Sequence, residues 1–204
     1  MRNEEERTEN RLILSAAAGA ASNEAEIVKF DLSNLEPYTG CISCFGCKQK
    51  GHEGECICRD GLAPVLKELR TADGLIIGSP IYLNHLSAGF HALFERLAFQ
   101  NITYCPEDML YQCPRLKVLL IVTSNMEAEG YGLRGYDKIL DEYKRGLESF
   151  VGPSELFISG DTLQVPDYSK YHWTMFDPEA KERRHETVFP KELEQAFRIG
   201  ADLL

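Results

Sequence analysis

The feature that most constrains the fold is a pair of short segments made almost entirely of apolar residues. Residues 74–78 read GLIIG and residues 117–123 read KVLLIVT. Continuous apolar runs of this length are typical of strands buried on both faces, as in parallel sheets covered by helices. Segments with helical spacing lie before, between and after these runs, which is the pattern of a mostly parallel sheet. The sequence therefore predicts an α/β protein with a doubly wound sheet in three layers, α/β/α.

Two more strands and several helices complete the expected order. Residues 26–32 (EIVKFDL) alternate apolar and polar side chains and are predicted as a strand. Residues 155–159 (ELFIS) are predicted as the last strand. Asp60 is expected to cap a helix. Helices are expected at residues 10–21, 60–71, 87–99, 136–150 and 191–204. Residues 161–188 are expected to be irregular. We assign residues 1–160 to one α/β domain, and residues 161–204 to a C-terminal arm and helix that pack on it.

Composition excludes several classes of protein. A chain of 204 residues, with 44% hydrophobic and 26% charged residues, is typical of one globular domain. It contains no apolar run long enough to span a membrane, so no membrane partner is expected. The first ten residues are rich in Glu and Arg, unlike a secretory signal, which favours a cytoplasmic location. The net charge of −10 argues against nucleic acid, because binding phosphates requires a basic face.

Five of the seven cysteines lie close together in the chain. Cys41, Cys44 and Cys47 recur at two-residue intervals in CISCFGC, and Cys56 and Cys58 follow after a gap. Without a secretory signal, such a cluster indicates metal ligands or redox thiols rather than disulfides. Three cysteines in series open the iron–sulfur run of ferredoxins, whereas zinc sites usually use two separated pairs. An iron–sulfur cluster, zinc and free thiols all stay open, and the spacing does not decide between Cys56 and Cys58 as fourth ligand.

Polar loops follow the two apolar strands. The first contains Ser79, Pro80, Ile81 and Tyr82, and the second contains Thr123, Ser124 and Asn125. The carboxyl ends of parallel strands meet at one edge of the sheet, where doubly wound folds bind ligands. We therefore expect the loops to open side by side, with donors for the edge of a planar polar ring and a tyrosine for its face. The alternative for each loop is ordinary turn chemistry without a ligand.

Taken in order, these motifs resemble those of the NAD(P)H-dependent FMN reductases, and in particular of their iron–sulfur flavoprotein branch. The resemblance is carried by CISCFGC…GEC, ADGLIIGSPIYLNHLSAGFHALFER and KVLLIVTSN, and it covers roughly residues 8–125. It implies a flavodoxin-like fold that binds FMN, assembled as a homodimer or homotetramer.

The resemblance also implies roles for individual residues. In the family, a Ser-Pro-x-Tyr loop and a Thr-rich loop hold the flavin, an Asn-Thr pair ends the phosphate loop, and four cysteines ligate a [4Fe–4S] cluster. The implied flavin-binding residues are Ser79, Pro80, Ile81, Tyr82, Asn84, Thr123, Ser124 and Asn125, with Thr8 as the remnant of the phosphate loop. The implied cluster ligands are Cys41, Cys44, Cys47 and Cys56.

The chain departs from the family pattern in two places. Eight residues separate Cys47 from Cys56, more than the family's usual gap, which bears on whether a cluster assembles. The family's first strand and its Gly-Ser-Pro-Arg phosphate loop are missing before Thr8. That strand is central in the order 2-1-3-4-5, so its loss leaves two neighbouring strands with unpaired edges. Either the sequence starts late, or the sheet closes differently and phosphate binding is impaired.

Three functions are consistent with these motifs. The favoured one is an FMN-dependent redox flavoprotein that passes electrons from NAD(P)H or a ferredoxin-like donor, through a [4Fe–4S] cluster, to a small acceptor. The second is a flavin-dependent quinone or nitro-compound reductase without a cluster. The third is a non-enzymatic metal- or thiol-binding module on a degenerate flavodoxin-like scaffold. Because the cofactor carries the chemistry of flavoproteins, no catalytic side chain is assigned.

Overall fold

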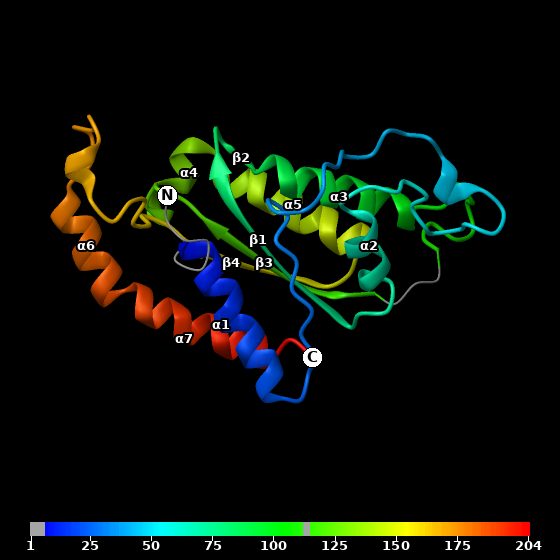
Figure 1. Cartoon of the computed structure of the whole chain (residues 1–204), viewed down its shortest axis with the longest axis horizontal. Helices are drawn as coiled ribbons and strands as arrows, with labels where there is room; N and C mark the ends of the chain where they lie inside the picture. The colour runs from blue at the N-terminus through cyan, green and yellow to red at the C-terminus, as the bar shows by residue number, and fades with distance from the viewer. Residues whose placement is uncertain (1–6, 112–114) are drawn as a thin grey trace.

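Four strands form one sheet in this computed structural model, which describes residues 7–111 and 115–204 (Figure 1). Their order in the sheet is β2-β1-β3-β4. The parallel strands are β1 (Gly74–Tyr82), β3 (Lys117–Thr123) and β4 (Ser154–Ser159). The short β2 (His85–Leu86) folds back antiparallel on the end of β1. The predicted α/β class is therefore confirmed.

Helices cover both faces of the sheet, so the three layers are also confirmed. The face that α1 (Thr8–Ser22) and α7 (Phe189–Ala201) cover lies opposite the face that α2 (Ala63–Leu69), α3 (Ala88–Asn101) and α5 (Tyr136–Phe150) cover (Figure 1). The shorter elements are η2 (Gly46–Lys48), η3 (Ala128–Gly130), α4 (Tyr131–Arg134), η4 (Tyr168–Lys170) and α6 (Pro178–Thr187). Among the described residues, no helix is long and apolar enough to cross a membrane.

Strand β3 divides the hydrophobic core into two parts, because successive side chains point to opposite faces of a strand. Val118, Leu120 and Val122 pack toward α2, α3 and α5, while Leu119 and Ile121 pack toward α1 and α7. All five are buried, which explains why the segment reads as a continuous apolar run.

Helices α1 and α7 lie side by side at very close range (Figure 1). A Cβ atom at Gly19 would lie 1.9 Å from the Phe197 carbonyl oxygen, and one at Gly200 would lie 1.9 Å from the Ala16 carbonyl oxygen. Both glycines are therefore required for the backbones to approach. This contact ties the C-terminal helix to the first helix.

Residues 26–32 do not form a strand, so this prediction is wrong. The segment has no partner strand, and Ile27 and Val28 are 44% and 51% exposed. Among the described residues, no strand precedes β1, and the edge of β1 away from β3 pairs over residues 81–82 alone. An alternating pattern becomes a strand only where a neighbour can complete its hydrogen bonds. In the expected strand order, residues 26–32 would pair with the missing first strand. Without that partner among the described residues, the segment does not join the sheet.

Residues 161–188 are also more regular than predicted, because they contain α6. Asp177 accepts a hydrogen bond from the backbone N–H of Ala180 at 3.1 Å, and Pro178 occupies the first helical turn. An aspartate cap followed by proline is a helix start signal. Charged residues on all sides of α6 hide the apolar periodicity on which the sequence prediction relies.

Candidate functional site

The carboxyl ends of the three parallel strands lie side by side. The register pairs Pro80 of β1 with Thr123 of β3, and Thr123 with Ser159 of β4. Ser79, Thr123 and Ser159 are buried at this edge. The structure thus brings together the two loops that the sequence places after the apolar strands, at the edge where doubly wound sheets bind ligands.

The first loop is a hairpin rather than an open turn. β1 continues through Tyr82, and the chain reverses at Leu83 and Asn84, whose φ angles of 48° and 73° are in the left-handed region. Non-glycine residues adopt this region at a cost, and do so mainly in tight turns. Tyr82 is 63% exposed, and its side chain is available to a flat ligand.

The Ser79 hydroxyl is used inside the protein. Ser79 is fully buried, and its Oγ accepts a hydrogen bond from the Ser87 backbone N–H at 2.8 Å. Ser87 in turn caps α3, because its Oγ accepts a bond from the backbone N–H of Phe90. Ser79 therefore fixes the hairpin to the start of α3.

The second loop is likewise bonded within the protein. The Ser124 hydroxyl donates to the Met126 carbonyl at 2.6 Å and accepts from the Tyr131 hydroxyl at 2.7 Å. Burial raises the pKa of Tyr131, and this hydrogen bond opposes the rise only in part. Asn125 accepts a hydrogen bond from Lys181 Nζ through its side-chain oxygen at 2.7 Å. Hydrogen bonds from within the loop, from Tyr131 and from Lys181 therefore fix the positions of its polar groups.

Lys181 is a buried cation that the sequence reasoning missed. Its side chain is 7% exposed, and Nζ lies 2.5 Å from an Asp161 carboxylate oxygen and 2.9 Å from the Asn125 carbonyl oxygen. It comes from α6, in the segment predicted to be irregular. Helix α6 thus reaches the strand-end loops through one charged side chain.

Thr8 begins α1 and is buried. The N-terminus of a helix presents free N–H groups and the positive end of its dipole, which suits an anion. Residues 1–6, where the rest of a phosphate loop would fall, lie outside the described residues.

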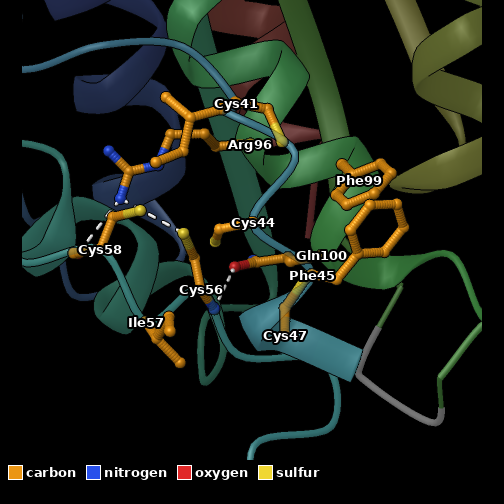
Figure 2. Close-up of a pocket in the computed structure, with 11 residues that line it drawn as sticks. Cys41, Cys44, Phe45, Cys47, Cys56, Ile57, Cys58, Arg96, Phe99 and Gln100 are labelled. Atoms are coloured by element: carbon orange, nitrogen blue, oxygen red, sulfur yellow. Dashed lines mark hydrogen bonds between the residues drawn. The ribbon is translucent and has the colours of Figure 1, made fainter. Parts of the chain in front are cut away.

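The second candidate site is a pocket that we name the cysteine pocket (Figure 2). It encloses about 310 Å³ of empty space, part of it open to solvent. All five clustered cysteines line it. The complete lining is Cys41, Ile42, Cys44, Phe45, Cys47, Cys56, Ile57, Cys58, Arg96, Phe99 and Gln100.

The chain is folded tightly around this pocket. Ser43 and Phe45 have φ angles of 53° and 55°, so the backbone turns sharply once between Cys41 and Cys44 and again between Cys44 and Cys47. A Cβ atom at Gly46 would lie 2.2 Å from the end of the Ile57 side chain, so a larger residue there would displace Ile57 where the two parts of the loop meet. The two-residue spacing thus places Cys41, Cys44 and Cys47 along the wall of one pocket.

The charged side chain in the lining of the cysteine pocket is Arg96, which pairs with Asp60 outside it. Arg96 of α3 bonds both carboxylate oxygens of Asp60 through NH1, at 2.6 and 2.7 Å. Its NH2 lies 3.3 Å from Cys56 Sγ and 3.2 Å from the Cys58 carbonyl oxygen (Figure 2). Burial acts to raise the pKa of Asp60, but hydrogen bonds from Arg96 outweigh it and lower the pKa.

The predicted cap at Asp60 is wrong in detail. Helix α2 begins at Ala63, and the Asp60 carboxylate accepts a hydrogen bond from the Leu62 backbone N–H instead.

The thiols of the cysteine pocket differ in their surroundings. Cys47 is buried, Cys44 is exposed, and the other three are half-buried. Burial raises the pKa of Cys58 to about 11, with further contributions from Cys56 and Cys44. Burial likewise raises the pKa of Cys47. Within residues 7–111 and 115–204, no three His, Cys, Asp or Glu side chains converge as metal ligands do. The pocket gathers the thiols without bringing them to ligand geometry.

The layers and strand order define a flavodoxin-like α/β protein. The chain superposes on an NAD(P)H:quinone oxidoreductase from Methanothermobacter marburgensis with a TM-score of 0.67, over 100% of this chain and 95% of the other. At 13% sequence identity this similarity shows the fold alone.

The chain belongs to the family of NADPH-dependent FMN reductases, whose family model matches residues 3–135. The expected membership in this family of flavoprotein oxidoreductases is therefore confirmed.

Two curated relatives are named iron–sulfur flavoproteins. One, from Methanocaldococcus jannaschii, is 37% identical over 73 residues, which is 36% of this chain and 35% of the relative. The other, from Methanosarcina thermophila, is 30% identical over 82 residues, which is 38% of this chain and 41% of the relative. The matched segments span well under half the length of these relatives.

Proposed function

We propose that this chain is an FMN-dependent redox flavoprotein that passes electrons from NAD(P)H or a ferredoxin-like donor, through a [4Fe–4S] cluster in the cysteine pocket, to a small acceptor. The observation that carries this proposal is that α3 joins both candidate sites. Its capping residue, Ser87, is bonded to Ser79 at the strand-end loops, and its later residues Arg96 and Gln100 line the cysteine pocket. At 1.5 Å per residue, Ser87 and Arg96 lie about 14 Å apart along the helix axis. One rigid element therefore sets the spacing of the two sites.

For the flavin site, exposed Tyr82 at the carboxyl edge of the sheet fits a flat cofactor. FMN, when bound, accepts a hydride or electrons and releases them singly or in pairs. The chain contributes position. Ser79 and Ser124 hold the two loops in place through internal hydrogen bonds, and the N-terminus of α1 at Thr8 favours the phosphate. The proposed flavin-binding residues are Thr8, Ser79, Pro80, Ile81, Tyr82, Asn84, Thr123, Ser124 and Asn125.

For the cluster, the donor set of the cysteine pocket fits iron–sulfur chemistry. Thiolates are the ligands of such clusters, and five thiols line this one pocket. Cys56 is the better fourth ligand, because its backbone N–H is held by the Gln100 side-chain oxygen at 3.2 Å and its Sγ lies beside Arg96. The proposed ligands are Cys41, Cys44, Cys47 and Cys56.

A second candidate is a flavin-dependent quinone or nitro-compound reductase without a cluster. It is favoured by the thiols of the described chain, which do not converge as metal ligands. In this case the cysteine pocket holds free thiols, and electrons pass from NAD(P)H through the flavin alone.

The experiment that separates the candidates combines FMN titration with cysteine variants. The full chain is titrated anaerobically with FMN, followed by flavin fluorescence, and turnover is measured for Cys41→Ser with Cys105→Ser as control, since Cys105 lies outside the pocket. The proposal expects saturable FMN binding and loss of turnover in Cys41→Ser alone. Unchanged turnover in Cys41→Ser favours the reductase without a cluster, and bound zinc without FMN binding favours a non-enzymatic module.

We also propose that the protein is a cytoplasmic homodimer or homotetramer, in line with the resemblance of its motifs to the FMN reductases. Sedimentation of the FMN-loaded protein tests the assembly, and a monomer at micromolar concentration contradicts it.

A further inference from the structure

Arg96 is buried as deeply as an apolar core residue. Its side chain is 1% exposed, and it is the largest of the fully buried side chains among the described residues. A charge taken out of water needs a partner of opposite charge and hydrogen bonds for its remaining donors. The surroundings of Arg96 therefore show what the cation is placed there to meet.

Asp60 satisfies one side of the guanidinium. Both of its oxygens accept from NH1, at 2.6 and 2.7 Å, and its own side chain is 21% exposed. The Asp60 carboxylate therefore keeps contact with solvent while it fixes the orientation of Arg96.

The other side of the guanidinium faces the thiols. NH2 lies 3.3 Å from Cys56 Sγ, and the buried Nε has no hydrogen-bond partner. Buried donors without partners are rare in proteins. The cation thus has unused donor capacity in the cysteine pocket, on the side where cluster ligands would carry negative charge.

We propose that Arg96 is a positioning residue of the cysteine pocket, which donates a hydrogen bond to the Cys56 thiolate, selects it over Cys58 as ligand and makes the bound cluster easier to reduce. This inference rests on the proposed function, because it needs a cluster in the pocket.

The direction of the effect follows from charge. A [4Fe–4S] cluster held by these cysteines would supply one-electron chemistry, so its reduction would add one negative charge beside Arg96 without forming or breaking a covalent bond. A fixed cation beside the thiolates stabilises the form with the extra electron, and hydrogen bonds to the ligand sulfurs act in the same direction. Losing the cation makes the reduction potential more negative, while losing only Asp60 makes it less negative.

The selection of Cys56 follows from geometry. Cys58 offers its carbonyl oxygen to Arg96, and Cys56 offers its sulfur. The Gln100 side chain holds the Cys56 backbone, so both the sulfur and its main chain are positioned by α3. In the described structure, Cys58 contacts Arg96 through its carbonyl oxygen and not through its sulfur.

The test compares Arg96→Met and Arg96→Lys with Arg70→Met. Arg70 is a matched control, because it also bonds the cysteine-rich segment, at the Gly54 carbonyl and Glu55, but it is half-exposed outside the pocket. Each full-length protein is reconstituted with iron and sulfide. The readouts are iron retention against a chelator and the midpoint potential from an EPR-monitored titration with dithionite.

We expect Arg96→Met to hold iron about 10–100-fold more weakly than wild type against the chelator, the usual cost of removing a hydrogen-bond partner of a metal ligand, and to have a more negative potential. Arg96→Lys should be intermediate, and Arg70→Met should match wild type. Asp60→Asn should have a less negative potential. Cys56→Ser should lose the four-iron signal, while Cys58→Ser keeps it.

Unchanged potential and iron retention in Arg96→Met overturn the inference and leave the proposed cluster intact. If Arg96→Met does not fold, judged by circular dichroism, unchanged potentials in Arg96→Lys and Asp60→Asn overturn it instead. Loss of the cluster in Cys58→Ser with retention in Cys56→Ser overturns the selection of Cys56. Wild-type protein that takes up no iron and sulfide overturns the proposed cluster, and the role of Arg96 with it.

Discussion

The buried hydroxyl of Ser79 accepts a hydrogen bond from the backbone N–H of Ser87 at 2.8 Å, which locks the end of β1 to the start of α3. Ser79→Ala leaves this buried N–H without its partner. A buried donor that loses its partner costs about 1–3 kcal/mol of unfolding free energy. Urea unfolding of the variant should show this loss, while the exposed Ser33→Ala should change stability by about 0.5 kcal/mol or less. Equal stability of the two variants would mean that the hairpin does not depend on Ser79.

Tyr82 gives the flavin site a test that does not depend on turnover. Its exposed ring at the end of β1 can stack on a flat cofactor, which is worth about 0.5–1.5 kcal/mol for aromatic pairs. Tyr82→Ala should therefore weaken FMN binding by roughly 2- to 13-fold in a fluorescence titration. Tyr104, equally exposed but packed on Phe45 by the cysteine pocket, provides the matched control. A larger effect of Tyr104→Ala on FMN binding argues against a flavin at the strand ends.

Lys181 tests whether α6 supports the strand-end loops. Lys181→Met leaves Asp161 and the Asn125 loop without their buried cation. Breaking a buried pair from one side costs about 3–5 kcal/mol, and the partial exposure of Asp161 places the expected loss near the lower end. Lys170→Met, which removes an exposed pair with Asp167, should cost about 1 kcal/mol or less. Chemical denaturation of both variants measures the difference, and equal losses would contradict a supporting role for α6.

The raised pKa of Tyr131 predicts that part of the protein's stability is lost at alkaline pH. Its pKa is raised in the folded state, chiefly by burial, so the unfolded chain loses this proton first. The stability linked to Tyr131 is therefore complete below about pH 10 and is lost as the pH rises above it. Tyr131→Phe should lose less stability than wild type between pH 9 and pH 11, measured by urea unfolding at each pH. A steeper loss in the variant would contradict this assignment of the buried proton.

The parts of the fold that the sequence predicts best are those whose burial is complete. β3 reads as a continuous apolar run because every one of its residues after Lys117 is buried. Residues 26–32 have an equally regular pattern, but pairing depends on a neighbouring strand that the pattern itself does not describe. At α6 the sequence pattern misses an element that does form. This helix begins at the Asp177 cap and has no apolar face that the pattern could detect.

The cysteine pocket shows the same division between spacing and tertiary contact. The intervals between Cys41, Cys44 and Cys47 predict that the thiols face one centre, and all line one pocket. Spacing does not reveal Arg96, because a single arginine between apolar helix positions resembles a surface charge. Its one signal is that it lies four residues after Ala92 and three after Leu93, a spacing that places it on the same inward face of α3.

The most direct test of the central claim is the content of iron, acid-labile sulfide and flavin in the full chain purified without oxygen. We expect about four irons, about four sulfides and one FMN per chain. A variant in which both Cys41 and Cys44 are replaced by serine should lose the iron and sulfide but keep the FMN. Protein that binds zinc in place of iron, or that takes up no FMN when the cofactor is supplied, would contradict the central claim.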